Sequence, residues 1–317
     1  MTYVMLVLSL VLLVVGANWL VDGSAAIARR YHISEYIIGA TIVGMGTSTP
    51  ELVVSLISGI EGHSDIAIGN VVGSNIFNVL LILGITALML PIRYTRDNIR
   101  RDIPLNIGVS VIVIVLCVLN KVFCGEYGLS RISGLLLLIL FALYLWTTLR
   151  GGRDQQSDED AGTPAGCYRY TVVCVISIIT GLAGLIYGGN LFVDAASAIA
   201  REWGVSEAVI GLTIVAGGTS LPELVSSVIA VTKKKGQMAL GNIVGSNIFN
   251  LLLILGAAST VCPLTMGGIT FVDWGVMLLS SLVLLMASIT FKKRELDRKD
   301  ASVFLIIYVG YMVWLLQ

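Results

Sequence analysis

The chain has 317 residues, equal numbers of acidic and basic side chains, and a charged fraction of only 13%. Its hydrophobic fraction is 56% and its mean hydropathy is +0.91. Soluble domains are typically about 45–50% apolar and about 25% charged, so this composition excludes an ordinary soluble domain. The apolar runs, such as Val4 to Val15 and Leu135 to Leu145, are continuous and do not alternate with polar residues. We therefore predict an all-α integral membrane protein and not an outer-membrane barrel.

Ten transmembrane helices are predicted from the apolar runs. In chain order they cover residues 3–21, 35–58, 66–90, 103–119, 132–149, 170–189, 206–230, 238–261, 272–291 and 302–316. The longest polar gap, 150–169, is rich in Gly, Ser, Asp and Glu and predicts a flexible linker loop. This linker separates a first half, 1–149, from a second half, 170–317, and each half contains five predicted helices.

The two halves repeat one another at a constant offset. GATIVGMGTSTPELVVS from residue 39 matches GLTIVAGGTSLPELVSS from residue 211. GNVVGSNIFNVLLILG from residue 69 matches GNIVGSNIFNLLLILG from residue 241, with 14 of 16 positions identical. Because each half has an odd number of spans, the second half must enter the membrane from the opposite side. The sequence therefore predicts two inverted-topology five-helix repeats with a binding site near the bilayer midplane.

The distribution of Lys and Arg predicts the orientation in the membrane. The loops after odd-numbered spans hold 17 basic residues, and the loops after even-numbered spans hold 3. By the positive-inside rule the odd loops, including the 150–169 linker and the solvated loop at Lys233–Lys235, lie in the cytoplasm. Both termini are then outside, and we expect a multi-pass protein of the cell (inner or plasma) membrane.

A glutamate follows a proline inside the second and the seventh span, at Glu51 and Glu223. An acidic side chain at the centre of a span costs about 2.5–3.5 kcal/mol on insertion scales, so a purely structural role is poorly motivated. Pro50 and Pro222 lack an N–H, which frees a backbone carbonyl one turn earlier. The expected result is a broken helix that offers a bare carbonyl beside a carboxylate.

Oxygen-bearing side chains lie one helical turn apart in both repeated motifs. In each GTSxPE segment a threonine precedes the glutamate by four residues, and in each GNxxGSNxxN segment a serine precedes the last asparagine by four, so each pair shares a helical face. These are hard oxygen ligands, which suit sodium or calcium and not zinc or copper. The pairs are Thr47 with Glu51, Thr219 with Glu223, Ser74 with Asn78, and Ser246 with Asn250.

Other polar residues near the motifs have structural interpretations. Asn75 and Asn247 are expected to bond backbone groups at helix breaks, and Asp22 is expected to be a cap or a loop anchor. Glu35 follows Ser34 at the start of a span, where a helix N-terminus favours negative charge. The glycines of the second motif, spaced as in GxxxG, are assigned to helix packing.

With these motifs in both halves, the chain resembles the sodium/calcium exchanger family of the cation/calcium antiporter superfamily, in its prokaryotic form without a regulatory domain. The resemblance implies that Glu51 and Glu223, supported by Asn78 and Asn250, bind sodium and calcium at the midplane. It implies further ligands from hydroxyl groups and from two backbone carbonyls: Thr47, Ser48, Thr219, Ser220, Ser74 and Ser246, and the carbonyls near Gly44 and Ala216. Spans one and six are implied to slide and so to switch access. Apart from the transported ions and the lipid bilayer, the resemblance implies no cofactor, no nucleic acid and no protein partner.

Two departures from relatives bear on the coupling ion. Some relatives, including potassium-dependent exchangers, carry Asp at the position matched by Asn250, so Asn predicts potassium independence. Proton-coupled relatives carry a GNxxE pattern in place of GTSxPE. This chain has GTSxPE in both halves, which argues against proton coupling. The expected function is therefore a secondary active antiporter, not an enzyme, that exchanges sodium for calcium, electrogenically if the family's three-for-one ratio applies. A proton-coupled antiporter for calcium or another divalent cation is the alternative. The inverted repeat favours alternating access over a passive channel.

Overall fold

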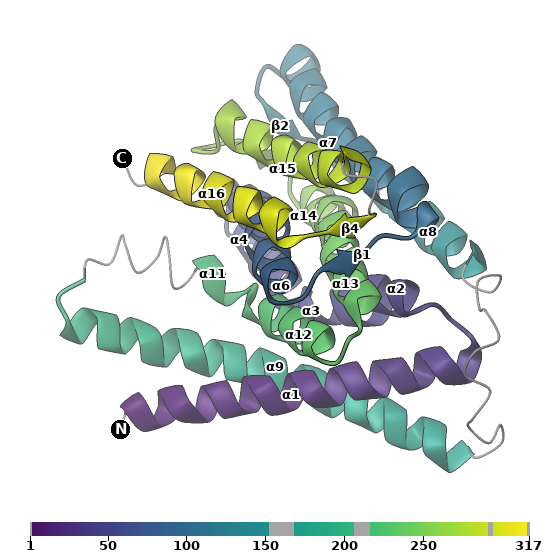
Figure 1. The fold of residues 1–317 in the computed structure, drawn as a ribbon. Coiled ribbons are helices and arrows are strands. Elements are labelled where there is room, and N and C mark those ends of the chain that lie inside the picture. Colours follow the sequence, from purple (N-terminus) through teal and green to yellow (C-terminus); the bar gives the residue numbers. More distant parts are fainter. Residues whose placement is uncertain (1, 152–167, 206–215, 291–293, 316–317) are drawn as a thin grey trace. The chain divides into compact units, whose positions relative to one another are not determined.

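The computed structural model describes residues 2–151, 168–205, 216–290 and 294–315, and these residues are almost entirely helical (Figure 1). Within these ranges, 7 helices are long and apolar enough to cross a membrane, or up to 8 if the broken pair Glu35–Thr47 and Thr49–Ile60 counts as one span. This confirms the predicted class of all-α membrane protein. Every predicted span overlaps helix, whereas the number of ten crossings stays a prediction, and residues 152–167 of the predicted linker lie outside the described residues.

Two compact units make up the chain, and each takes residues from both halves of the sequence. Unit 1 comprises Met1–Thr47 and Trp146–Asn242, and unit 2 comprises Ser48–Leu145 and Ile243–Gln317. The first boundary coincides with the break after Thr47, and two long helices, α8 and α13, contribute residues to both units. The division into 1–149 and 170–317 refers to the sequence repeat and stays a prediction.

Unit 1 is built around two long helices. Its elements are α1 (Thr2–Tyr31), α2 (Glu35–Ile38), a π-helical segment (Gly39–Val43), α3 (Gly44–Thr47), α9 (Tyr168–Glu202), α11 (Ala216–Gly218), α12 (Leu221–Thr232), the end of α8 (Arg131–Gly151) and the start of α13 (Gly236–Phe249). Helices α1 and α9 have 30 and 35 residues and extend well beyond the predicted limits at residues 21 and 189. The extensions contain no proline and are rich in alanine, a strong helix former, so both helices continue into polar sequence.

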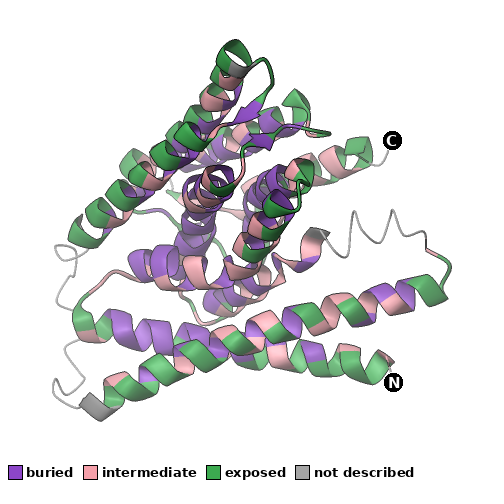
Figure 2. Ribbon diagram, turned by 180° about the vertical axis from the view of Figure 1, so that it is seen from behind, coloured by how far each residue is buried: buried purple, intermediate pink, exposed green. Residues whose placement is uncertain are grey.

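Helices α1 and α9 lie side by side (Figure 1) and approach each other at glycines. A Cβ atom added to Gly16 would lie 2.8 Å from the carbonyl oxygen of Gly181, and one added to Gly181 would lie 2.7 Å from that of Gly16. Only residues without a side chain allow backbones to come this close. Figure 2 shows the first turns of α1, near the N-terminus, largely exposed and its second half largely buried.

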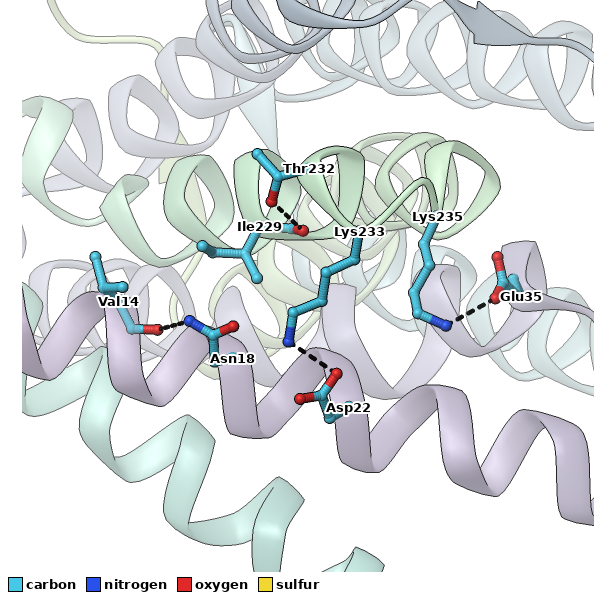
Figure 3. A network of polar contacts seen from close by, with 8 residues as sticks. All are labelled: Val14, Asn18, Asp22, Glu35, Ile229, Thr232, Lys233 and Lys235. Carbon is cyan, nitrogen blue, oxygen red and sulfur yellow. Dashed lines mark hydrogen bonds and ion pairs between the residues drawn. The ribbon is translucent and has the colours of Figure 1, made fainter.

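The turn between α12 and α13 is attached to α1 and α2 by ion pairs. Lys233 Nζ lies 2.8 Å from Asp22 Oδ1, and Lys235 Nζ lies 3.1 Å from Glu35 Oε1 (Figure 3). Asp22 therefore anchors a loop as predicted. Ser34, for which no role was predicted, caps α2 by accepting a hydrogen bond from the backbone N–H of Ile37. The side chains of Lys233 and Lys235 are 26% and 14% exposed in these pairs, and the cytoplasmic placement of the loop stays a prediction. Partly exposed pairs contribute about 0–1 kcal/mol each, so they orient the turn more than they stabilise the fold.

Unit 2 contains the remaining helices and two short ladders. Its elements are α4 (Thr49–Ile60), α5 (Ser64–Ile76), a π-helical segment (Phe77–Ile82), α6 (Leu83–Met89), β1 (Ile92–Arg93), a π-helical segment (Asn98–Asp102), α7 (Ile103–Cys124), β2 (Gly128–Leu129), most of α8, the end of α13, a π-helical segment (Asn250–Ile254), α14 (Leu255–Val261), β3 (Leu264–Thr265), α15 (Phe271–Thr290), β4 (Glu295–Leu296) and α16 (Arg298–Leu315).

The two ladders connect loops that are far apart in the sequence. Strand β1 pairs antiparallel with β4, with Ile92 opposite Leu296, and β2 pairs antiparallel with β3, with Gly128 opposite Thr265. The loops after the third and ninth predicted spans therefore meet, as do those after the fourth and eighth. Each ladder therefore joins two loops that the predicted topology places on the same side of the membrane.

Candidate cation site

A helix break precedes each repeated glutamate. Ser48 has φ −81° and ψ 11°, and Ser220 has φ −91° and ψ 7°, so both leave the helical range. A proline follows in the first turn of the next helix, where its missing N–H removes no hydrogen bond. As a result Glu51 and Glu223 stand in the first turns of α4 and α12, where the helix dipole favours a negative charge.

Both glutamates are buried, with exposed fractions of 1% for Glu51 and 0% for Glu223. A buried carboxylate is costly unless a cation or hydrogen-bond donors compensate it. The predicted site residues are divided between the two units. Unit 1 holds Gly44, Thr47, Ala216, Thr219, Ser220 and Glu223, and unit 2 holds Ser48, Glu51, Ser74, Asn78, Ser246 and Asn250. That the two sets together form one site stays a prediction from the repeat.

In unit 1, a buried asparagine joins Thr47 to the helix that carries Glu223. Thr47 Oγ1 lies 3.3 Å from Asn242 Oδ1, within hydrogen-bonding distance. The amide nitrogen of Asn242 donates to the backbone oxygen of Glu223 at 3.4 Å and to Ser227 Oγ at 2.8 Å. Unit 1 therefore brings together a threonine of the first repeat and a glutamate segment of the second, through a residue of α13.

The equivalent asparagine of the first repeat holds α4 in the same way within unit 2. Asn70 Nδ2 donates to the backbone oxygen of Glu51 at 3.2 Å and to Ser55 Oγ at 2.9 Å. Asn70 and Asn242 are not among the predicted site residues, although both stand at the start of the repeated GNxxGSN segment. A donor that bonds the first turn of a broken helix fixes the position of the glutamate there.

Four asparagines form a symmetric cluster in unit 2. Asn75 Nδ2 donates to the backbone oxygen of Asn247 at 3.3 Å, and Asn247 Nδ2 donates to that of Asn75 at 3.4 Å. Asn78 Nδ2 donates to Asn247 Oδ1 at 3.0 Å, and Asn250 Nδ2 donates to Asn75 Oδ1 at 3.1 Å. Asn75 and Asn247 do bond backbone groups as predicted, but each bonds the other repeat. They also orient the amides of the two predicted ligands.

This orientation leaves two amide oxygens without partners. Asn78 Oδ1 and Asn250 Oδ1 are buried and accept no hydrogen bond from any residue that the structure describes. Buried polar atoms are normally bonded, so an orphaned pair at equivalent repeat positions indicates a missing ligand. Both residues lie in π-helical segments, Phe77–Ile82 and Asn250–Ile254, which are frequent at functional sites.

Further oxygen groups lie near this cluster within unit 2. Helix α4, which carries Glu51, packs against α5 and against the segment Asn250–Ile254. Ser74 and Ser246 are buried and precede the two ligand asparagines by one helical turn. Unit 2 thus contains the carboxylate of Glu51 on α4, two amide oxygens without a partner and two hydroxyl groups. All of these are hard oxygen ligands of the kind that sodium and calcium prefer.

The chain is similar to known exchangers over nearly its whole length. Residues 1–150 and 173–317 match the family model described as sodium/calcium exchanger protein. The putative antiporter CaxA of Alkalimonas amylolytica is 38% identical, over 97% of this chain and 96% of that protein. The sodium/calcium exchanger MaX1 of Methanosarcina acetivorans is 33% identical, over 98% and 97%. A solved structure of the sodium-calcium exchanger NCX_Mj, soaked with 10 mM Na⁺ and zero Ca²⁺, matches with a TM-score of 0.84 and 33% identity over 98% of both chains. The chain belongs to the sodium/calcium exchanger family.

Proposed function

We propose that this chain exchanges sodium for calcium at a site in which Glu51, Glu223, Asn78 and Asn250 supply the principal oxygen ligands. The observation that carries the proposal is the pair of buried amide oxygens on Asn78 and Asn250 that no described residue bonds. A bound cation would satisfy both. The other proposed ligands are the hydroxyl groups of Thr47, Ser48, Ser74, Thr219, Ser220 and Ser246 and the carbonyl groups of Gly44 and Ala216.

The charge of the site accounts for both ions and for a coupling to voltage. With both glutamates ionised and both asparagines neutral, the empty site carries −2. One Ca²⁺ or two Na⁺ neutralise it, and a third Na⁺ leaves +1. Exchange of three Na⁺ for one Ca²⁺ moves one net charge per cycle, which couples transport to the membrane potential at about 2.3 kcal/mol per 100 mV.

The same site supports two finer proposals. Asn250 keeps the number of carboxylates at two, so no further monovalent cation is needed for neutrality and transport is independent of potassium. Alternating access would use α1 and α9, the first and sixth predicted spans, whose glycine contact lets them slide as one body. In the proposed orientation both termini are outside and Lys233–Lys235 is in the cytoplasm, in a multi-pass protein of the cell membrane.

The test is calcium uptake into proteoliposomes loaded with sodium, compared at fixed pH with vesicles loaded with choline. Uptake should require internal sodium, should be accelerated by an inside-positive potential and should not respond to external potassium. If a proton gradient drives uptake equally well in choline, the proton-coupled antiporter is the correct function. Uptake without any counter-ion would indicate a passive channel.

A further inference from the structure

Three arginines line an open pocket at one end of unit 2. The pocket has a volume of about 420 Å³ and is lined by Arg96, Ile99, Arg100, Ser288, Ile289 and Arg294. Two of the arginines precede α7, and the third follows α15. The β1–β4 ladder, visible in Figure 1, holds these two loops together, and the N–H of Tyr94 donates to the backbone oxygen of Arg294 at 2.6 Å. The pocket is therefore built before any ligand arrives.

No described carboxylate forms an ion pair with the three arginines of this pocket. The side chains of Arg96, Arg100 and Arg294 form no hydrogen bond or ion pair with described residues. The lining contains no carboxylate. The nearby Glu295 is engaged by Arg93, with Nε 2.6 Å from Oε1. Three like charges around one cavity repel each other, and a bound anion would relieve that repulsion.

The location of the pocket suits a molecule that is partly polar and partly apolar. It lies where two candidate membrane spans end, Asn98–Phe123 at its start and Phe271–Ile289 at its finish, which is the level of lipid headgroups. Ile289 is 60% exposed and forms an apolar wall beside the arginines. Arginine presents a planar fork of donors that binds phosphate oxygens bidentately, and basic residues at this level attract anionic lipids.

We propose that this pocket binds the phosphate group of an anionic ligand, either the headgroup of an anionic phospholipid or a soluble phosphate. The apolar wall favours the lipid. The site is separate from the candidate cation site and does not depend on the proposed exchange function. A bound phosphate would join the loop before α7 to the loop after α15 and so stabilise unit 2 against unfolding.

The test measures thermal unfolding of the full-length protein in detergent micelles during titration with phosphatidylglycerol, phosphatidylcholine or inorganic phosphate. The pocket variant combines Arg96→Gln, Arg100→Gln and Arg294→Gln. The control variant combines Arg101→Gln, Arg298→Gln and Lys299→Gln, which removes the same charge from nearby positions outside the pocket lining, in the segment Asn98–Asp102 and at the start of α16. Each basic residue near an anionic surface strengthens binding roughly fivefold, so the pocket variant should bind phosphatidylglycerol roughly 100-fold more weakly than the wild type.

The control variant should respond to phosphatidylglycerol as the wild type does, and phosphatidylcholine should not raise the unfolding temperature of any of the three proteins. If inorganic phosphate alone reproduces the stabilisation and the pocket variant loses it, the site stands and its ligand is a soluble phosphate. Equal responses of the pocket and control variants, or no saturable response in the wild type, would overturn the proposal. Should the pocket variant fail to fold, Arg294→Gln compared with Arg298→Gln decides, with roughly fivefold weakening expected only in the former.

Discussion

Replacing Asn250 with aspartate would put an acceptor where the asparagine cluster holds a donor. Asn250 Nδ2 donates to Asn75 Oδ1 at 3.1 Å, so an ionised carboxylate would set one of its oxygens against that acceptor. Asn75 cannot turn its amide over without loss, because its Nδ2 donates to the backbone oxygen of Asn247 at 3.3 Å. Only the protonated acid, whose O–H donates to Asn75 Oδ1, keeps every bond of the cluster.

The free-energy cost of ionising the carboxyl group introduced at position 250 follows from the hydrogen bonds that ionisation would break. Loss of the bond to Asn75 costs about 1 kcal/mol, and the buried oxygen left without a donor costs about 1–3 kcal/mol more. The protonated form is thus favoured by about 2–4 kcal/mol. Asn250→Asp should therefore transport nearly normally at acidic pH and lose sodium-driven transport as the pH rises, when the site would carry −3.

The assay is sodium-dependent calcium uptake by proteoliposomes, measured from acidic to alkaline pH for the wild type and for Asn250→Asp. Asn106→Asp is the matched control. Asn106 is also buried in unit 2, but its Nδ2 donates to the hydroxyl of Ser281 at 3.0 Å, and a hydroxyl can rotate to donate to a carboxylate. The control should keep the wild-type pH profile. If Asn250→Asp also keeps it over the whole range, Asn250 is not a cation ligand and the reasoning is refuted.

Three further outcomes are expected. Glu51→Gln and Glu223→Gln should each abolish sodium-driven calcium uptake while the protein still inserts and folds, because one lost charge leaves Ca²⁺ uncompensated; near-normal uptake in either variant would contradict the four-ligand site. Asn242→Leu should lower the free energy of unfolding by about 1–3 kcal/mol, because the backbone oxygen of Glu223 and the hydroxyl of Ser227 lose their donor. An unchanged denaturation midpoint would show that these hydrogen bonds contribute nothing to stability. In intact cells, a membrane-impermeant thiol reagent should label a cysteine introduced at Gln317 and not one at Lys234, and the reverse pattern would refute the proposed orientation.

The sequence by itself determined the class of the fold, the repeat and the residues that stand out chemically. Continuous apolar runs indicate membrane helices wherever they occur, because the cost of exposing backbone and charge to lipid is a local property of the segment. A proline inside an apolar run indicates a broken helix, because proline lacks an N–H and clashes with the preceding turn, which is also a local property. The breaks at Ser48 and Ser220 confirm this prediction. The ends of α1 and α9 were misjudged, since helix propensity and not hydropathy decides where a helix stops.

Only the tertiary structure decided how the asparagines are used. Asn75 and Asn247 are separated by 172 residues, and Thr47 and Asn242 by 195. No periodicity within a segment reports on a partner at that distance. The repeat shows that two positions are equivalent, but not that the two copies touch each other and exchange hydrogen bonds. The assignment of Asn78 and Asn250 as residues with an open oxygen depends on which neighbour bonds the nitrogen of each amide, and that neighbour comes from the other half of the chain.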